Sequence, residues 1–376
     1  MNHFLLVTCL LHVSFLSVSG KVAHSGIHDQ IDHKDGKIKI IYSAEKDVFW
    51  PCPDPKAFLP CICTAESTAR IPIMDMDCSD VKNQDELINA FNTSMSYDQY
   101  RTLTIQPKVA SKELTFLNSE SFGTCSFKAV HISGTEIIKI EDGTFDHSHD
   151  SLMILDLQFN SISIFPFESI ANYLVLTELL LNSNKITIVE QIESKFLEVL
   201  NLNTNPGISF GSGLFVAAPV LITLDLGNCD LQNLTTNLFK DLHSLENLNL
   251  ERNNIGVLEE SSVVTPGATL LALRLNDNPI TDIKRGGIKG MSPDGQLFIQ
   301  NALIKELTEE VWEPVARILK QEAIKMSGNP LRCGCDLEWM FLKSETYYTR
   351  LESTTTCSDG YLVYDINPDV FDVHCN

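Results

Sequence analysis

An eleven-residue pattern, L-x-x-L-x-L-x-x-N-x-L, returns along the middle of this 376-residue chain and leaves few folds open to it. Six stretches follow it, with one extra residue in the third: LMILDLQFNSI, VLTELLLNSNKI, FLEVLNLNTNPGI, VLITLDLGNCDL, SLENLNLERNNI and LLALRLNDNPI. The asparagine position falls at Asn160, Asn184, Asn205, Cys229, Asn253 and Asn278, in steps of 24, 21, 24, 24 and 25 residues. One such unit cannot bury its own apolar face, so the pattern predicts a stack of units around one continuous core.

Weaker copies extend the array at both ends and bring it to ten units between about residues 100 and 331. Their asparagine positions hold Lys108, Thr135, Ala302 and Asn329. The L-x-L core reads as a short strand with both leucines pointing inward. The asparagine side chain can satisfy backbone groups where the chain leaves the strand, and Cys229 takes this position in its repeat.

The pattern is identified as the leucine-rich repeat. This resemblance implies an α/β solenoid, with a curved parallel sheet on the concave side and irregular turns and short helices on the convex side. We assign residues 99–328 to the repeats. A solenoid exposes core leucines and unpaired strand edges at both ends, so an extracellular one needs caps.

Eight cysteines form two clusters at the two ends of the array: Cys52, Cys61, Cys63 and Cys78, and Cys333, Cys335, Cys357 and Cys375. Taken alone, each cluster allows three disulfide connectivities. Zinc binding is disfavoured because each cluster contains C-x-C rather than C-x-x-C.

The stretch GNPLRCGCDLEWMFLK, residues 328–343, resembles the C-terminal cap of extracellular leucine-rich repeat proteins. The resemblance implies bridges Cys333–Cys357 and Cys335–Cys375 within a cap at 329–376, with Leu337, Trp339 and either Phe341 or Leu342 covering the last apolar layer. CPDPKAFLPCICT and MDMDCSD resemble the matching N-terminal cap, here at 50–98, and imply bridges Cys52–Cys63 and Cys61–Cys78.

The first residues favour secretion. The run from Phe4 to Val18 has the length of a signal-peptide core, with small residues before a cleavage point after Gly20. We therefore expect a signal peptide at 1–20, a partly disordered extension at 21–49, and a secreted protein without a membrane anchor. The net charge of −21 argues against nucleic acid, heparin and anionic membranes as partners.

The sequence contains few residues that point to catalysis or metal binding. The histidines and aspartates His24, His28, Asp29, Asp32 and His33 fit a solvated tail as well as a metal site. The same holds for DHSHD at 146–150, in a turn between repeats. Cys125 and Cys229 lie about four repeats, or roughly 19 Å, apart, too far to pair, and we interpret them as buried thiols. No nucleotide-binding, zinc-protease or serine-hydrolase motif occurs, so we expect no enzyme, no metal and no cofactor.

The concave face is the expected binding surface. Its outward positions lie four and six residues before each asparagine position. The first column holds Thr104, His131, Asp156, Leu180, Asn201, Asp225, Asn249, Arg274, Phe298 and Lys325, and the second holds Thr102, Ala129, Ile154, Glu178, Val199, Thr223, Asn247, Ala272, Gln296 and Ala323. An apolar spot is expected at Ile154, Leu180 and Val199 with Phe159, and by residue type the best anchors are Arg274 and Phe298. The predicted partner site comprises Ile154, Asp156, Phe159, Glu178, Leu180, Asn201, Asp225, Asn249, Arg274 and Phe298. Ordinary exposed apolar surface is the competing interpretation of the spot.

Two N-glycosylation sequons occur, Asn92-Thr-Ser and Asn233-Leu-Thr. Both positions are expected to lie away from the concave strands, so glycans there would leave the predicted binding face open.

The N-terminal cap carries a narrower likeness. WPCPDPKAFLPCICT followed by MDMDCSDVKNQDELINAFN is similar to the arthropod secreted proteins grouped with the non-catalytic subunit of oplophorus-luciferin 2-monooxygenase, over about residues 50–376. The resemblance implies a non-enzymatic accessory or stabilising subunit whose partner is a small catalytic chain, and it supplies no catalytic residue. Luminescence is not implied, because non-luminous arthropods share the group. Two alternatives stay open, a recognition protein of innate immunity or cell-surface signalling and an enzyme or metal-storage protein on a repeat scaffold; the oligomeric state is also open.

Overall fold

The computed structural model describes residues 51–66, 72–109, 112–211, 213–343 and 346–375, together with two short strands near the N-terminus. These are β1 (His33–Lys34) and β2 (Lys37–Ile38), which pair antiparallel. The predicted signal peptide and the rest of the extension at 21–49 lie outside the described residues. The chain divides into two units, 1–47 and 48–376, and the second unit contains the repeats and both cysteine clusters.

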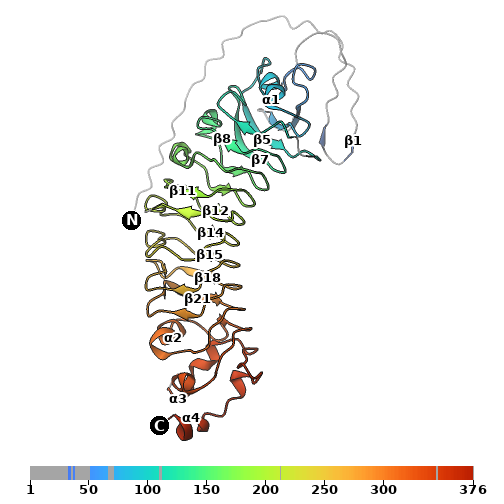
Figure 1. Ribbon diagram of the computed structural model, residues 1–376. Helices are drawn as coiled ribbons and strands as arrows, with labels where there is room; N and C mark the ends of the chain where they lie inside the picture. The colour runs from blue at the N-terminus through green and yellow to red at the C-terminus, as the bar shows by residue number, and fades with distance from the viewer. Residues whose placement is uncertain are drawn as a thin grey trace, which may run out of the picture. The chain divides into compact units, whose positions relative to one another are not determined.

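Ten parallel strands succeed one another through the described part of the array, one for each predicted repeat (Figure 1). They belong to a sheet of twelve strands in the order β22-β21-β18-β15-β14-β12-β10-β9-β7-β5-β4-β3. The ten are β5 (Gln99–Ile105), β7 (Ser126–Ile132), β9 (Ile154–Asp156), β10 (Glu178–Leu180), β12 (Val199–Asn201), β14 (Thr223–Asp225), β15 (Asn247–Asn249), β18 (Leu270–Arg274), β21 (Met291–Phe298) and β22 (Ile324–Lys325). The predicted leucine-rich repeat solenoid is confirmed.

The core consists of the leucines that the repeat places two residues apart. Leu179 and Leu181 in the β10 repeat are fully buried, as are Leu248 and Leu250 in the β15 repeat. Each such side chain contributes roughly 1.5–3 kcal/mol when it leaves water. Because the same positions recur in every repeat, the buried leucines form one uninterrupted column behind the sheet.

The asparagines form a ladder that joins each repeat to the one before it. Asn184 donates through Nδ2 to the Leu181 carbonyl of its own repeat and the Leu157 carbonyl of the preceding one, both at 2.9 Å, while its Oδ1 accepts from Ile162 N at 2.9 Å. Asn160, Asn205, Asn253, Asn278 and Asn329 bond in the same manner. The side chain therefore satisfies buried backbone groups that lack a partner in the sheet.

The repeats without an asparagine depart from the ladder in ways that their side chains explain. The Cys229 thiol lies 3.2 Å from the Leu202 carbonyl and replaces the amide with a weaker donor. Ala302 is buried but has no polar atom to contribute, and Lys108 is exposed. The ladder thus begins at Thr135, whose hydroxyl donates to Asn160 Oδ1 at 2.7 Å.

The residue just before each ladder position adopts a left-handed backbone. Phe159 has φ 56°, Ser183 57°, Arg252 54° and Asp277 57°. This conformation costs a non-glycine residue roughly 1–2 kcal/mol, and each such N–H donates to the next repeat, as Ser183 N does to Asn203 O at 2.8 Å. The position just before the ladder residue therefore adopts this strained conformation in successive repeats, even though the residue type there differs.

The return segments on the other side of the core contain more strand than the repeat pattern predicts. Besides the helices η1 (Asp146–Ser148), η2 (Phe167–Asn172) and α2 (Glu309–Ala316), four two-stranded parallel sheets form within the described residues. They are β6 (Phe116–Leu117) with β8 (Lys139–Ile140), β11 (Ile188–Val189) with β13 (Ser209–Phe210), β16 (Val257–Leu258) with β19 (Asp282–Ile283), and β17 (Val263–Val264) with β20 (Ile288–Lys289). Two-residue strands carry no readable alternation, so the sequence offers no signal for them.

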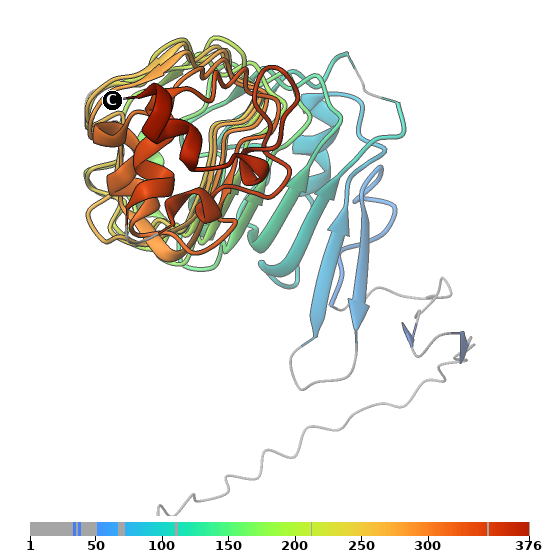
Figure 2. The same cartoon turned by 90° about the horizontal axis from the view of Figure 1, so that it is seen from below.

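An antiparallel hairpin closes the N-terminal end of the sheet, with β3 (Ile62–Glu66) outermost and β4 (Ile73–Asp77) paired parallel to β5 (Figure 2). Disulfides join Cys52 to Cys63 and Cys61 to Cys78, the pairs that the family resemblance implies. A short helix with acidic residues in its first turn comes next as α1 (Gln84–Phe91), capped by Asn83, whose side chain accepts from Glu86 N.

The C-terminal end is covered by short helices: η3 (Cys335–Leu337), α3 (Glu338–Leu342), η4 (Tyr347–Arg350), η5 (Val363–Asp365) and α4 (Asp369–His374) (Figure 2). Disulfides Cys333–Cys357 and Cys335–Cys375 tie this cover together, again as the resemblance implies. Leu337, Trp339 and Phe341 are buried and Leu342 is exposed, while Trp339 Nε1 donates to Leu307 O at 2.7 Å. No helix in the described part of the chain is long and apolar enough to cross a membrane.

Candidate binding surface

The solvent-facing side of the twelve-stranded sheet, called the open face below, carries the two predicted columns in the predicted register. Leu180 on β10 lies opposite Asp156 on one side and Asn201 on the other. Pairing continues through Asp225, Asn249, Arg274, Phe298 and Lys325, and back through His131 and Thr104 to Asp77. The second column is aligned equally, with Glu178 between Ile154 and Val199.

Four residues of the first column have a structural task that the sequence reasoning missed. Asp156, Asn201, Asp225 and Asn249 each accept, through Oδ1, a hydrogen bond from the backbone N–H two residues later, at 3.2, 3.0, 2.9 and 2.9 Å. These are Asx turns, which aspartate and asparagine form readily. The recurrence of Asp or Asn at one repeat position was the available signal, and it indicates a turn requirement before it indicates a partner.

Asp156 also differs from the exposed contact residue that we expected, because its side chain is only 9% exposed. His131 Nδ1 lies 3.2 Å from its Oδ2, and Gln158 Nε2 donates to the same oxygen at 3.1 Å. Neighbouring polar side chains thus cover this carboxylate, which leaves it poorly placed to contact a partner directly.

Leu180 breaks the Asx column at a position where its neighbours are Asp156 and Asn201. A leucine cannot accept the turn hydrogen bond, and on this face it stays partly exposed. Ile154 and Val199 flank it diagonally in the second column, although Glu178 separates them from each other. The expected apolar spot is therefore three side chains centred on Leu180.

Phe159 does not belong to a strand, contrary to its grouping with the apolar spot. It occupies the left-handed turn position just before Asn160 and is 58% exposed. Its place is beside the open face rather than in either column, because the chain has already turned out of β9 (Ile154–Asp156).

Arg274 and Phe298 also break the Asx column, at its C-terminal end. The guanidinium carbon of Arg274 lies 5.1 Å from the centroid of the Phe298 ring, within the range of a cation–π contact. Lys325 lies on the next strand, opposite Phe298.

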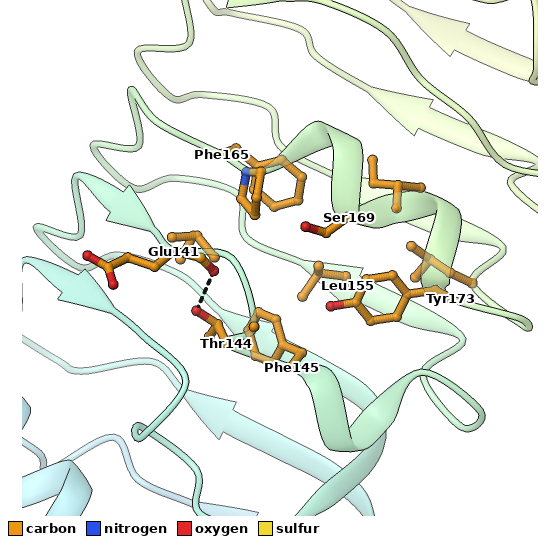
Figure 3. Close-up of a pocket in the computed structure, with 12 residues that line it drawn as sticks. Glu141, Thr144, Phe145, Leu155, Phe165, Ser169 and Tyr173 are labelled. Carbon is orange, nitrogen blue, oxygen red and sulfur yellow. Dashed lines mark hydrogen bonds between the residues drawn. The ribbon is translucent and has the colours of Figure 1, made fainter.

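Two hollows elsewhere on the protein are too small for a small-molecule ligand. The hollow in Figure 3 lies among Glu141, Phe145, Phe165 and Tyr173 on the return side, where Thr144 Oγ1 donates to Glu141 O at 2.7 Å. Its free space is about 10 Å³, about what one water molecule needs. A second hollow beside Trp312 is no roomier.

The described part of the chain also holds no group of three or more histidine, cysteine or acidic side chains arranged for a metal ion. The stretch at 146–150 contains instead a histidine–aspartate pair, with His149 Nε2 3.3 Å from Asp146 Oδ1. Four of the five N-terminal histidines and aspartates considered for metal binding lie outside the described residues. The fifth, His33, is described only as part of β1 (His33–Lys34).

The two remaining cysteines, Cys125 and Cys229, are unpaired and buried. Burial raises the pKa of the Cys125 thiol to about 12 and that of the Cys229 thiol to about 11. At neutral pH both therefore stay protonated, and neither is a nucleophile.

Comparison with known proteins gives one extensive relative. No family model matches the chain. The chain is 28% identical over 327 residues to the Oplophorus-luciferin 2-monooxygenase non-catalytic subunit of Oplophorus gracilirostris, covering 86% of this chain and 88% of that protein. It is 25% identical over 186 residues to Tsukushi of Gallus gallus, covering 48% and 49% respectively. The chain is a homologue of the non-catalytic subunit, as the N-terminal cap suggested.

Solved structures share the fold. A chain of the octameric complex of Latrophilin 3, Unc5D and FLRT2 superposes with a TM-score of 0.55 at 19% identity, covering 75% of this chain and 83% of that one. A chain of the Toll–Spatzle complex of Drosophila gives 0.52 at 16% identity, covering 79% and 44%. These neighbours support the leucine-rich repeat architecture alone.

Proposed function

We propose that this protein is a secreted, non-enzymatic accessory subunit that binds a protein partner through the open face of its sheet. The relative of Oplophorus gracilirostris is named as a non-catalytic subunit and aligns along most of both chains. By analogy, the partner here is a small catalytic chain of a secreted complex. Four disulfides support an oxidising, extracellular setting.

The observation that carries the proposal is Leu180. In the first column, the neighbouring Asp156 and Asn201 each accept an Asx-turn hydrogen bond from the backbone. Leu180 cannot accept this bond and instead places an apolar side chain on the open face. Ile154 and Val199 enlarge the apolar surface around it. A local rule broken without a structural gain is expected at a functional position.

The substitution Leu180→Asn tests this directly. It restores the residue type that the column prefers, so the variant should fold and secrete as well as the natural chain. We expect its affinity for the co-purifying partner to fall about tenfold, the loss typical of an interface anchor. The matched control is Ile188→Asn, since Ile188 is 62% exposed but lies on β11 on the return side.

The partner is identified by isolating the tagged protein from its native source and analysing what remains bound. One small chain in fixed proportion supports an accessory subunit. Microbial surface molecules would replace the proposal with immune recognition. Light emission by the isolated complex on addition of oplophorus luciferin would extend the analogy to bioluminescence. Equal binding by the natural chain and Leu180→Asn, with loss in Ile188→Asn, would move the interface to the return side.

A further inference from the structure

Three side chains at the C-terminal end of the open face form a group that the rest of that face does not repeat. Arg274 on β18, Phe298 on β21 and Lys325 on β22 are aligned in one column. All three are partly exposed. Neighbouring strands lie about 4.8 Å apart, so the aromatic ring stands between two cations whose Cα atoms are about 10 Å apart, a span that both flexible side chains can close.

The Arg274 guanidinium already contacts the Phe298 ring when no ligand is bound. Its central carbon lies 5.1 Å from the ring centroid, and a guanidinium placed over an aromatic face keeps its N–H groups for other acceptors. Less conformational entropy is therefore lost when these groups bind an acceptor.

Three carboxylates from the same end of the array pair with other groups. Glu251 accepts from Asn276 Nδ2 at 3.0 Å, Glu352 accepts from the backbone N–H of Ser327 at 2.7 Å, and Asp277 lies 3.7 Å from Arg252. Within the described residues, Arg274 and Lys325 form no ion pair with an acidic side chain. The charges of Arg274 and Lys325 therefore remain available to a group from outside.

We propose that Arg274, Phe298 and Lys325 bind a carboxylate-bearing segment of the protein partner, an inference that rests on the proposed function of the open face. The planar guanidinium fork matches a carboxylate through two parallel hydrogen bonds, and Phe298 offers apolar contact to the stem of the same residue. An extended polyanion fits less well, because only two cations are grouped here on a chain of net charge −21.

A peptide selection with the full-length protein tests the proposal. A random dodecapeptide library is selected on the natural chain and counter-selected on the double variant Arg274→Ala/Lys325→Ala. We expect the enriched peptides to share an aspartate or glutamate next to an apolar residue, and to bind Arg274→Ala about tenfold more weakly or worse. Arg274→Lys should lose less, because it keeps the charge but not the fork.

The matched control is Arg252→Ala, since Arg252 is an exposed arginine in a turn beside the sheet rather than on it. Peptides without acidic residues, equal binding to the double variant, or no enrichment at all would overturn the proposal. So would binding of a heparin fragment that depends on Arg274. If capture of the native partner depends on Leu180 but not on Arg274 or Lys325, this inference fails while the proposed function stands. If it depends on none of the three, both fail.

Discussion

Replacing one ladder asparagine should remove a large share of the stability of the protein. Asn253 is 4% exposed. Its Nδ2 donates to Leu226 O and Leu250 O at 2.9 Å each, and its Oδ1 accepts from Cys229 N at 2.9 Å and Leu231 N at 3.0 Å. In Asn253→Ala both backbone N–H groups stay buried without an acceptor, at roughly 1–3 kcal/mol each. The expected loss is therefore about 2–6 kcal/mol before the two carbonyls are counted.

The loss is measured by urea unfolding monitored by circular dichroism. The dependence of the unfolding free energy on urea concentration should be the same in both proteins, so that a shift of the midpoint concentration reports a change in stability. The control is Asn254→Ala, which removes the same atoms from the exposed neighbouring residue, whose amide donates to Asp230. We expect the control to stay within about 0.5 kcal/mol of the natural chain. If Asn253→Ala costs less than about 1 kcal/mol, water or a backbone shift satisfies the freed groups, and the structural account of the ladder is wrong.

The caps, the sequons and the thiols give three further expected outcomes. Cys335→Ser opens a bridge that spans 40 residues and should cost about 4 kcal/mol in the chain-entropy model, visible as poor secretion or a much lower melting temperature; unchanged melting would refute its structural role. Mass spectrometry after deglycosylation should find glycans at Asn92, Asn233 or both, which are exposed and off the open face, whereas a glycan on an open-face strand would contradict the register. Burial raises the pKa of the Cys125 thiol to about 12 and that of the Cys229 thiol to about 11, from an ordinary 9.0. The stability that the two protonated thiols contribute is therefore fully present below pH 9 and is lost as the pH rises through the folded-state pKa values. When the pH is raised from 8 to 10, the free energy of unfolding of the natural chain should fall by about 1 kcal/mol per thiol more than that of the Cys125→Ala/Cys229→Ala variant. Urea unfolding at the two pH values measures this difference, and equal falls would contradict the assigned burial.

The sequence predicts the sheet well because one short pattern determines strand, core and register together. Once Asn160 and Asn184 are recognised as equivalent, the pairing of Leu155 with Leu179 and of Asp156 with Leu180 is found by counting. Any slip would turn buried leucines to solvent, so the register has little freedom.

What the sequence does not predict depends on side chains that belong to different repeats. The covering of Asp156 requires His131 and Gln158 to reach it from the preceding strand and the next turn. The stacking of Arg274 on Phe298 likewise depends on how two side chains orient across neighbouring strands. Counting positions shows that such residues are neighbours, but not whether they cover, pair with or leave one another exposed.

The ladder also determines where neighbouring repeats are coupled most weakly. Each ladder asparagine hydrogen-bonds its repeat to the preceding one. Ala302 cannot form this bond to the Asn278 repeat, and the Cys229 thiol forms only a weak one to the Asn205 repeat. Side-chain coupling through the buried ladder is therefore weakest at three junctions: before the Thr135 repeat, after the Asn205 repeat and after the Asn278 repeat. We expect neighbouring repeats to separate first at these junctions when the solenoid is stretched or partly denatured.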